Sequence, residues 1–266
     1  MKKVIYTVGL SMMLSACTDW LTVQPEASMT TETLFQTDNG VKYGLNGAYM
    51  LAQYVYGPSG SLGGTSIVEN MANTYLYTIN SDGEKWANHI YEDTDSQKNV
   101  NASTFLQSYN IIANLNSLLN EMVAHQGKIT PECYAIVRGE AFALRACCHF
   151  DLLRVYGPVP SKVDAGKRYL PYVRVNDPEN YEYHTFDQFM EYVQADLDSA
   201  EFLLGKYDPV LTTKISSTES TSYEWSYRKS RINYYGVLGL QARVALWNGE
   251  EEKAVRYARL VKDAKD

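Results

Sequence analysis

Cysteine is scarce in this chain, which has four among 266 residues, and the shortage limits covalent cross-linking. Cys133 and Cys147 fall in one predicted helix, where roughly 14 residues at about 1.5 Å each put them about 21 Å apart, far beyond the reach of a disulfide. Cys147 and Cys148 are adjacent and point to different faces of that helix. None of these spacings is typical of a metal site. We therefore expect three packed thiols, no disulfide framework and no metal ion.

Positive charge is also in short supply. The 24 Lys and Arg residues are outnumbered by 31 Asp and Glu residues, which gives a formal net charge of -7 and a pI near 5.2. Proteins that bind nucleic acid need a stripe of lysine and arginine to displace counterions from the phosphate backbone. We expect no nucleic-acid partner.

Catalytic and cofactor signatures are missing as well. The sequence contains no Gly-x-Ser-x-Gly elbow, no His-Glu-x-x-His pair, no Walker loop and no Gly-x-Gly-x-x-Gly before a helix. Of the four histidines, His149 lies inside a helical pattern beside Phe150, where packing is the simpler role. The two carboxylates of a glycosidase can lie far apart in the sequence and meet only in the folded protein, so they leave no sequence pattern. A carbohydrate-active enzyme therefore stays an alternative. We expect a protein that is not an enzyme and needs no cofactor.

The N-terminus has the three parts of an export signal. Met1-Lys2-Lys3 is basic, the apolar run from Val4 to Met13 is too short to span a bilayer, and Leu14-Ser15-Ala16-Cys17 follows it. This ending resembles a bacterial lipobox, which implies removal of residues 1–16 and attachment of acyl chains to Cys17 as a membrane anchor. The alternative is an ordinary secretory signal in which Cys17 is incidental. Residues 17–33 are polar and contain a proline, so we expect them to be a tether.

Helical periodicity, by contrast, is abundant. Apolar residues recur at three- and four-residue steps, a pattern typical of helices with one buried face. Thr130 and Pro131 have the order expected of a helix start, while Gly157, which tolerates a left-handed turn, and Pro158 end the same helix. We predict a mostly all-α fold, with long irregular loops between helices over residues 40–56, 104–124, 131–156, 186–204, 233–247 and 250–262.

The last two predicted helices resemble a tetratricopeptide unit. They meet at Asn248-Gly249 and carry small residues that would let their backbones approach closely. Units of this kind cannot bury their apolar faces alone, so we expect them to stack on other helix pairs. The small residues that we expect to face one another are Gly239, Ala242 and Ala245 on the first helix and Ala254, Ala258 and Val261 on the second.

The predicted helix over residues 131–156 carries charged residues among its apolar ones. Arg145 follows Leu144 on the apolar stripe, where a guanidinium needs carbonyl or carboxylate partners. We interpret the charged residues of this helix as members of helix-spanning ion pairs and as contacts that hold loops. These residues are Arg138, Glu140, Arg145, Asp151 and Arg154.

Tyrosine is in excess, with 22 residues in the chain, and residues 69–103 combine tyrosine and a tryptophan with several asparagines. This stretch has little periodicity and reads as a long surface loop, a kind of segment that is often functional. Aromatic faces suit the C–H side of a pyranose, and amide and carboxylate groups suit its hydroxyls. The alternative is that the aromatic rings only seal the loop onto the helices. The candidate ligand-binding residues are Tyr75, Tyr77, Asp82, Trp86, Asn88 and Tyr91.

The segment from Arg138 to Pro160 resembles the hallmark of the SusD/RagB family of outer-membrane glycan-binding lipoproteins. Its two ends read Arg-Gly-Glu-Ala-Phe-Ala-Leu-Arg-Ala and Phe-Asp-Leu-Leu-Arg-Val-Tyr-Gly-Pro-Val-Pro. Other matches occur in the family's order along nearly the whole chain. They are Cys17 with Asp19-Trp20-Leu21 and Pro25, then Tyr109, Ile112, Asn116 and Leu118-Leu119, then Asp196-Leu197 with Ala200 and Leu203-Leu204, and the helix pair from Arg231.

The resemblance implies a helical body of tetratricopeptide-like pairs, lipid-anchored at the outer membrane and facing outward. Such a protein acts as a lid on a SusC-like, TonB-dependent transporter and captures oligosaccharides or peptides without catalytic residues. The alternative is a helical-repeat scaffold that contacts the transporter but binds no sugar. Family members are usually much longer, which implies that residues 34–266 correspond to the N-terminal helical domain of a SusD-like protein.

Overall fold

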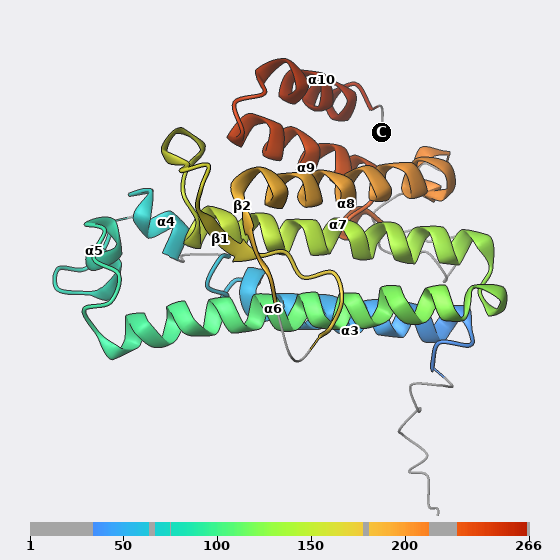
Figure 1. Ribbon diagram of the computed structural model, residues 1–266, viewed down its shortest axis with the longest axis horizontal. Coiled ribbons are helices and arrows are strands. Elements are labelled where there is room, and N and C mark those ends of the chain that lie inside the picture. The colour runs from blue at the N-terminus through green and yellow to red at the C-terminus, as the bar shows by residue number, and fades with distance from the viewer. Residues whose placement is uncertain (1–33, 64–66, 75, 178–180, 213–227, 265–266) are drawn as a thin grey trace, which may run out of the picture.

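The computed structural model describes residues 34–63, 67–74, 76–177, 181–212 and 228–264 (Figure 1). The predicted signal, Cys17 and the predicted tether lie outside the described residues. Two short antiparallel strands, β1 (Arg168–Pro171) and β2 (Tyr183–Thr185), accompany the helices. The prediction of a mostly all-α fold is confirmed. The helices are α3 (Asp38–Tyr56), α4 (Ile67–Met71), α5 (Asp82–Ala87), α6 (Asp95–Ala124), α7 (Pro131–Tyr156), α8 (Phe186–Tyr207), α9 (Tyr234–Trp247) and α10 (Glu251–Lys262).

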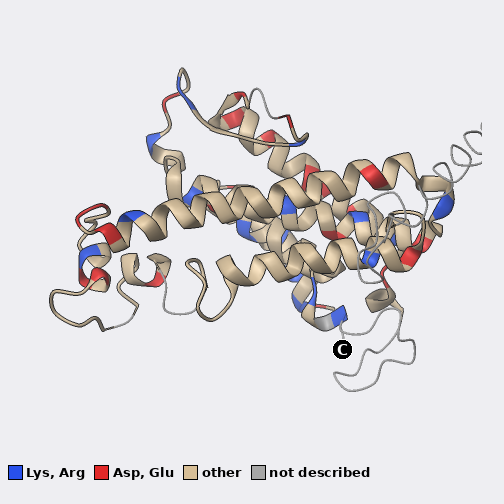
Figure 2. Ribbon diagram, turned by 90° about the horizontal axis from the view of Figure 1, so that it is seen from below, with Lys and Arg blue, Asp and Glu red and all other residues tan. Residues whose placement is uncertain are grey.

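The long helices form a stack that follows chain order. Helix α3 packs on α6, α6 on α7, α7 on α8, α8 on α9 and α9 on α10, while the short helices α4 and α5 lie at one end of α6 (Figure 1). Lysine, arginine, aspartate and glutamate are scattered over several helices of this stack (Figure 2). Among the described residues, no helix combines the length and the apolar character needed to cross a bilayer.

Helix α7 is the centre of the stack and has the bounds that its sequence predicts. The Thr130 hydroxyl accepts a hydrogen bond from the Cys133 amide, and Pro131 stands in the first turn. At the other end Gly157 is extended, with φ -101°, so the expected left-handed turn is wrong. The glycine is needed for space instead, because a Cβ atom there would lie 2.6 Å from the Leu153 carbonyl oxygen.

Helix α6 begins nine residues before the predicted start at Thr104, and the expected loop over residues 69–103 holds α4 and α5 as well. The early start is stabilised by a capping box: the Thr94 hydroxyl accepts from the Gln97 amide, and the Gln97 side chain accepts from the Thr94 amide. Gln97 is fully buried and donates to the Ile90 carbonyl at 2.7 Å. The additional turns, residues 95–103, are mostly polar, so the sequence has no apolar stripe there from which a helix could be predicted.

The closing pair α9 and α10 packs as predicted, with two corrections. Ala245 and Ala254 are buried. Ala258 is exposed, so the expectation that it faces α9 is wrong. A Cβ atom at Gly239 would touch nothing within 4 Å, so this glycine is not a point of close approach. Helix α10 has 12 residues and buries the face that carries Ala254 and Tyr257, whereas Ala258 lies on the exposed face.

Three of the five charges on α7, those of Glu140, Arg145 and Asp151, pair with other elements, as predicted. Arg154 pairs with Asp151 inside α7, and Arg138 forms its hydrogen bond with Tyr134 of the same helix, so an ion pair is the wrong expectation for Arg138 among the described residues. Arg145 is 4% exposed and donates to both carboxylate oxygens of Asp196 on α8 at 2.7 Å, and to the Asn116 side-chain oxygen on α6 at 2.7 Å. Glu140 forms ion pairs with Arg228 and Arg231, and its carboxylate accepts a hydrogen bond of 2.7 Å from the Tyr49 hydroxyl on α3. Asp151 pairs with Arg154 and Arg243. These bonds orient α7 against its neighbours.

His149 has the packing role that its sequence context predicts. It is fully buried, its Nε2 accepts from the Val173 amide at 2.9 Å, and its ring stacks on Tyr172 with centroids 3.8 Å apart. Burial lowers the pKa of His149 well below its ordinary value, so the ring is neutral and can accept that bond. The contact fixes the chain beside β1 against the stack.

Cys133, Cys147 and Cys148 are free thiols, as expected.

Candidate ligand-binding site

The described candidate residues lie in a corner formed by residues 67–74 and 76–94, which covers the N-terminal end of α6 (Figure 1). Polar contacts of helix α5 stabilise this corner and attach it to the start of α6. The Thr94 hydroxyl donates to Asp82 at 2.9 Å, and Lys85 pairs with Asp93 at 2.6 Å. The Lys85 ammonium holds the pKa of Asp93 below its usual value, so this carboxylate stays charged.

Three turns of the corner use left-handed backbone at residues that are not glycine. Asn73, Asn80 and His89 have φ values of 54°, 64° and 59°. Asparagine and histidine are among the side chains that enter this region most readily, although it costs more than for glycine. The turns fold the segment into short pieces, so an aperiodic sequence becomes a compact surface.

Helix α5 carries three of the candidate residues. Asp82 is in its first turn and is engaged by Thr94. Trp86 is half-buried, and its indole Nε1 is buried without a hydrogen-bond partner among the described residues. Asn88 caps the helix, is exposed, and donates to the Glu84 carbonyl at 3.0 Å. Asp82 therefore has a structural bond, while Trp86 has a donor left unused.

The two described tyrosines of the candidate set are exposed. Tyr77 is 39% exposed and Tyr91 is 44% exposed, and the Tyr91 hydroxyl contacts the His89 Nδ1 at 2.9 Å. Tyr75 lies outside the described residues. The rings of Tyr77 and Tyr91 are therefore accessible to a ligand, whereas the Trp86 side chain is half-buried.

Exposed aliphatic side chains form a part of this corner that sequence reasoning missed. Leu76 is fully exposed, Ile79 is 76% exposed and Ile90 is 47% exposed. Exposed apolar side chains, where they gather in one patch, typically mark a contact with another molecule. These residues interrupt the polar stretch in the sequence, but without periodicity they carried no signal of exposure.

A cavity of about 520 Å³ begins where the candidate residues end, directly after Tyr91. One wall is a face of α6 and the other is the last residue of α7. The Tyr156 hydroxyl donates to the Asn101 carbonyl at 2.7 Å, and burial raises the pKa of Tyr156 to about 12, which keeps its proton in place. Its lining includes Glu92, Lys98, Asn101, Phe105, Leu106 and Tyr156.

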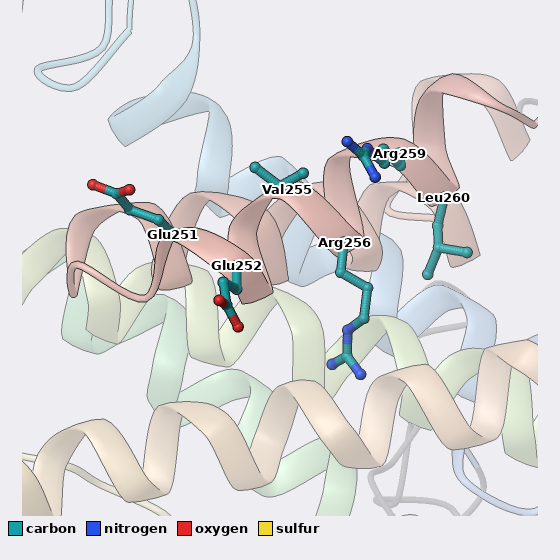
Figure 3. A pocket seen from close by; sticks show the side chains of 6 residues that line it. All are labelled: Glu251, Glu252, Val255, Arg256, Arg259 and Leu260. Carbon is teal, nitrogen blue, oxygen red and sulfur yellow. The ribbon is translucent and has the colours of Figure 1, made fainter.

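Two further cavities lie away from the candidate residues. One of about 360 Å³ lies between the end of α3 and α6 and is lined by Tyr54, Ser59, Asn99, Ser103 and Gln107, among others. The other, of about 580 Å³, runs along the outer side of α10 (Figure 3). In that view Glu251, Val255 and Arg259 follow one edge of the helix, and acidic residues precede basic ones, as the helix dipole favours.

The part of the chain that the structure describes contains no cluster of side chains arranged to bind a metal ion. No group of three or more histidine, cysteine, aspartate or glutamate side chains is placed there to hold a metal ion. The buried acids and bases of α7 are engaged with one another and with their neighbours. The corner thus offers aromatic, amide and aliphatic groups, which suit binding.

Sequence comparison links the chain to one family. A family profile described as SusD-like, "Starch-binding associating with outer membrane", matches residues 19–224. Two SusD-like proteins of Formosa agariphila are 24% identical over 165 residues and 28% identical over 147 residues. These alignments cover 60% and 55% of this chain but 31% and 27% of the relatives. The chain therefore spans about a third of the curated relatives it matches.

Structural comparison gives the same fold. A SusD superfamily protein from Bacteroides thetaiotaomicron is similar with a TM-score of 0.60 at 20% identity, over 85% of this chain and 46% of that one. A SusD-like carbohydrate binding protein from Bacteroides vulgatus is similar with a TM-score of 0.60 at 17% identity, over 85% and 44%. The resemblance seen in the sequence is confirmed. Because the family profile covers most of its length, this chain belongs to the SusD-like family.

Proposed function

We propose that the chain is a non-catalytic outer-membrane lipoprotein that captures an oligosaccharide for a TonB-dependent transporter. The family is described as starch-binding and associated with the outer membrane, which supports carbohydrate binding in general. The observation that carries the proposal is the corner itself, where the rings of Tyr77 and Tyr91 are exposed and helix α5 carries the half-buried Trp86. Aromatic faces next to polar donors are the groups that a sugar ring needs.

Titration calorimetry tests this proposal with a panel of oligosaccharides. Trp86→Ala should weaken binding about tenfold or more, because it removes an aromatic face. Tyr43→Ala is the matched control, since Tyr43 is 59% exposed on α3, away from the corner. A folded wild-type chain that binds no oligosaccharide of the panel would refute the proposal.

The membrane anchor is a separate part of the proposal, based on the lipobox-like sequence before Cys17. Replacing Cys17 by alanine should move the protein from the membrane fraction to the soluble fraction, because acyl chains supply the attachment. Mass spectrometry of the mature N-terminus identifies the acyl groups directly. Digestion of intact cells by an added protease tests whether the protein faces outward.

A second candidate function is a scaffold that contacts the transporter and binds no sugar. The exposed aliphatic side chains of the corner favour it, because Leu76, Ile79 and Ile90 suit a protein surface better than a glycan. Co-purification of the transporter that is lost in a Leu76→Ser and Ile79→Ser variant, without any sugar affinity in the wild type, would support this function over the first.

A further inference from the structure

The cavity between α6 and the end of α7 has an aromatic floor. The rings of Phe105 and Tyr156 meet edge to face, with centroids 5.4 Å apart and planes at 85°. Phe105 also contacts Tyr109 at 4.8 Å, so its ring is held from two sides. Both floor residues are half-buried rather than sealed, and the cavity opens above them. A rigid, partly open aromatic surface is suited to stacking against the apolar face of a sugar ring.

The rim of the cavity carries polar groups that the fold leaves unused. The side chains of Glu92 and Lys98 form no hydrogen bond or ion pair with another described residue within the usual distances, although Lys98, after Lys85, helps to lower the pKa of Asp93. The Asn101 amide nitrogen donates to the Tyr91 carbonyl at 2.9 Å, and no described residue donates to its side-chain oxygen. The rim therefore offers a carboxylate, an ammonium group and an amide oxygen.

The spacing of these residues shows why they share one cavity. Lys98, Asn101 and Phe105 follow one another at steps of three and four residues, which is one face of α6. That face exists because the helix begins at Asp95, in the polar extension that the sequence pattern did not reveal. The volume of about 520 Å³ lies in the range of small-ligand pockets.

The cavity is continuous with the corner. Glu92, which lines it, is the neighbour of Tyr91, and the Asn101 bond ties the Tyr91 backbone to the cavity wall. We propose that this cavity is a second sugar subsite, which binds a further ring of the same oligosaccharide that the corner captures. This inference rests on the proposed function. One glycan chain would cross from the exposed Tyr91 ring to the Phe105 and Tyr156 floor.

Calorimetry with matched short and long oligosaccharides tests the subsite. The probes are maltose and maltoheptaose, cellobiose and cellohexaose, and xylobiose and xylohexaose. For the long member of the pair that binds, Phe105→Ala should lower affinity about tenfold and Lys98→Ala severalfold, because each removes one contact with the added ring. The short member should lose affinity only in Trp86→Ala.

Lys98→Ala guards the test against misfolding, because its exposed side chain makes no described bond. Tyr43→Ala should change neither affinity. Equal affinity of wild type, Phe105→Ala and Lys98→Ala for the long probe would overturn the subsite while leaving capture at the corner intact. Failure of the wild type to bind any probe would instead overturn the proposed function, and the subsite with it.

Discussion

Removal of the Asp196 carboxylate is the perturbation whose effect the structure predicts most directly. Asp196 is 5% exposed and accepts from Arg145 at two oxygens, each at 2.7 Å, and from the Tyr172 hydroxyl at 2.6 Å. In Asp196→Ala the Arg145 guanidinium stays buried with Asn116 as its closest acceptor. Breaking a buried pair on one side costs about 3–5 kcal/mol, because the remaining charge is left uncompensated.

Urea unfolding followed by circular dichroism measures this loss as a lower midpoint at an unchanged slope. The matched control is Glu182→Ala, since the Arg168–Glu182 pair is 2.6 Å long but 51% and 71% exposed. An exposed pair contributes at most about 1 kcal/mol. The double variant Arg145→Met with Asp196→Leu should recover most of the stability that Asp196→Ala loses. Equal losses in Asp196→Ala and Glu182→Ala would refute the reasoning.

Three further predictions concern stability. Burial lowers the folded-state pKa of His149 and, less completely, of His184, so below about pH 6.5 the unfolded chain binds more protons. The contribution of His149 to stability should be full above that pH and fall by up to about 1.4 kcal/mol per unit as pH decreases, so the profile should be flatter in His149→Gln. Gly157→Ala should cost about 1–3 kcal/mol in urea unfolding, because its Cβ would lie 2.6 Å from the Leu153 oxygen; a neutral result would contradict the close approach. Thr94→Ala should cost about 1 kcal/mol and speed amide exchange in the first turn of α6, whereas unchanged exchange would show that the cap is dispensable.

The sequence predicted the helices that have an apolar face. Helix α7 has the predicted bounds because Thr130 and Gly157 are local signals that act through the backbone of their own segment. The need of Arg145 for a partner also followed from its place beside Leu144. Its partner on α8 did not, because residues 51 positions apart meet only through the packing of the stack.

The candidate site was harder to predict than the fold. Aromatic and amide composition pointed to residues 69–103, but a composition does not say which side chains are exposed. An aromatic binding loop would be expected to expose its tryptophan and bury its leucine. Here Trp86 is half-buried and Leu76 is fully exposed. The polar start of α6 was missed because Gln97 stabilises it through hydrogen bonds, which leave no periodic pattern.

The buried charges of α7 give each neighbouring helix a single register. Glu140 reaches α3, Arg145 reaches α6 and α8, and Asp151 reaches Arg243 on α9. Apolar side chains tolerate sliding, but a neighbour displaced by one turn, about 5.4 Å, would leave a charge stranded without its partner. Apolar residues of the stack can therefore be exchanged during evolution with little effect on alignment, whereas a change in any of these charges would require a matching change on another helix.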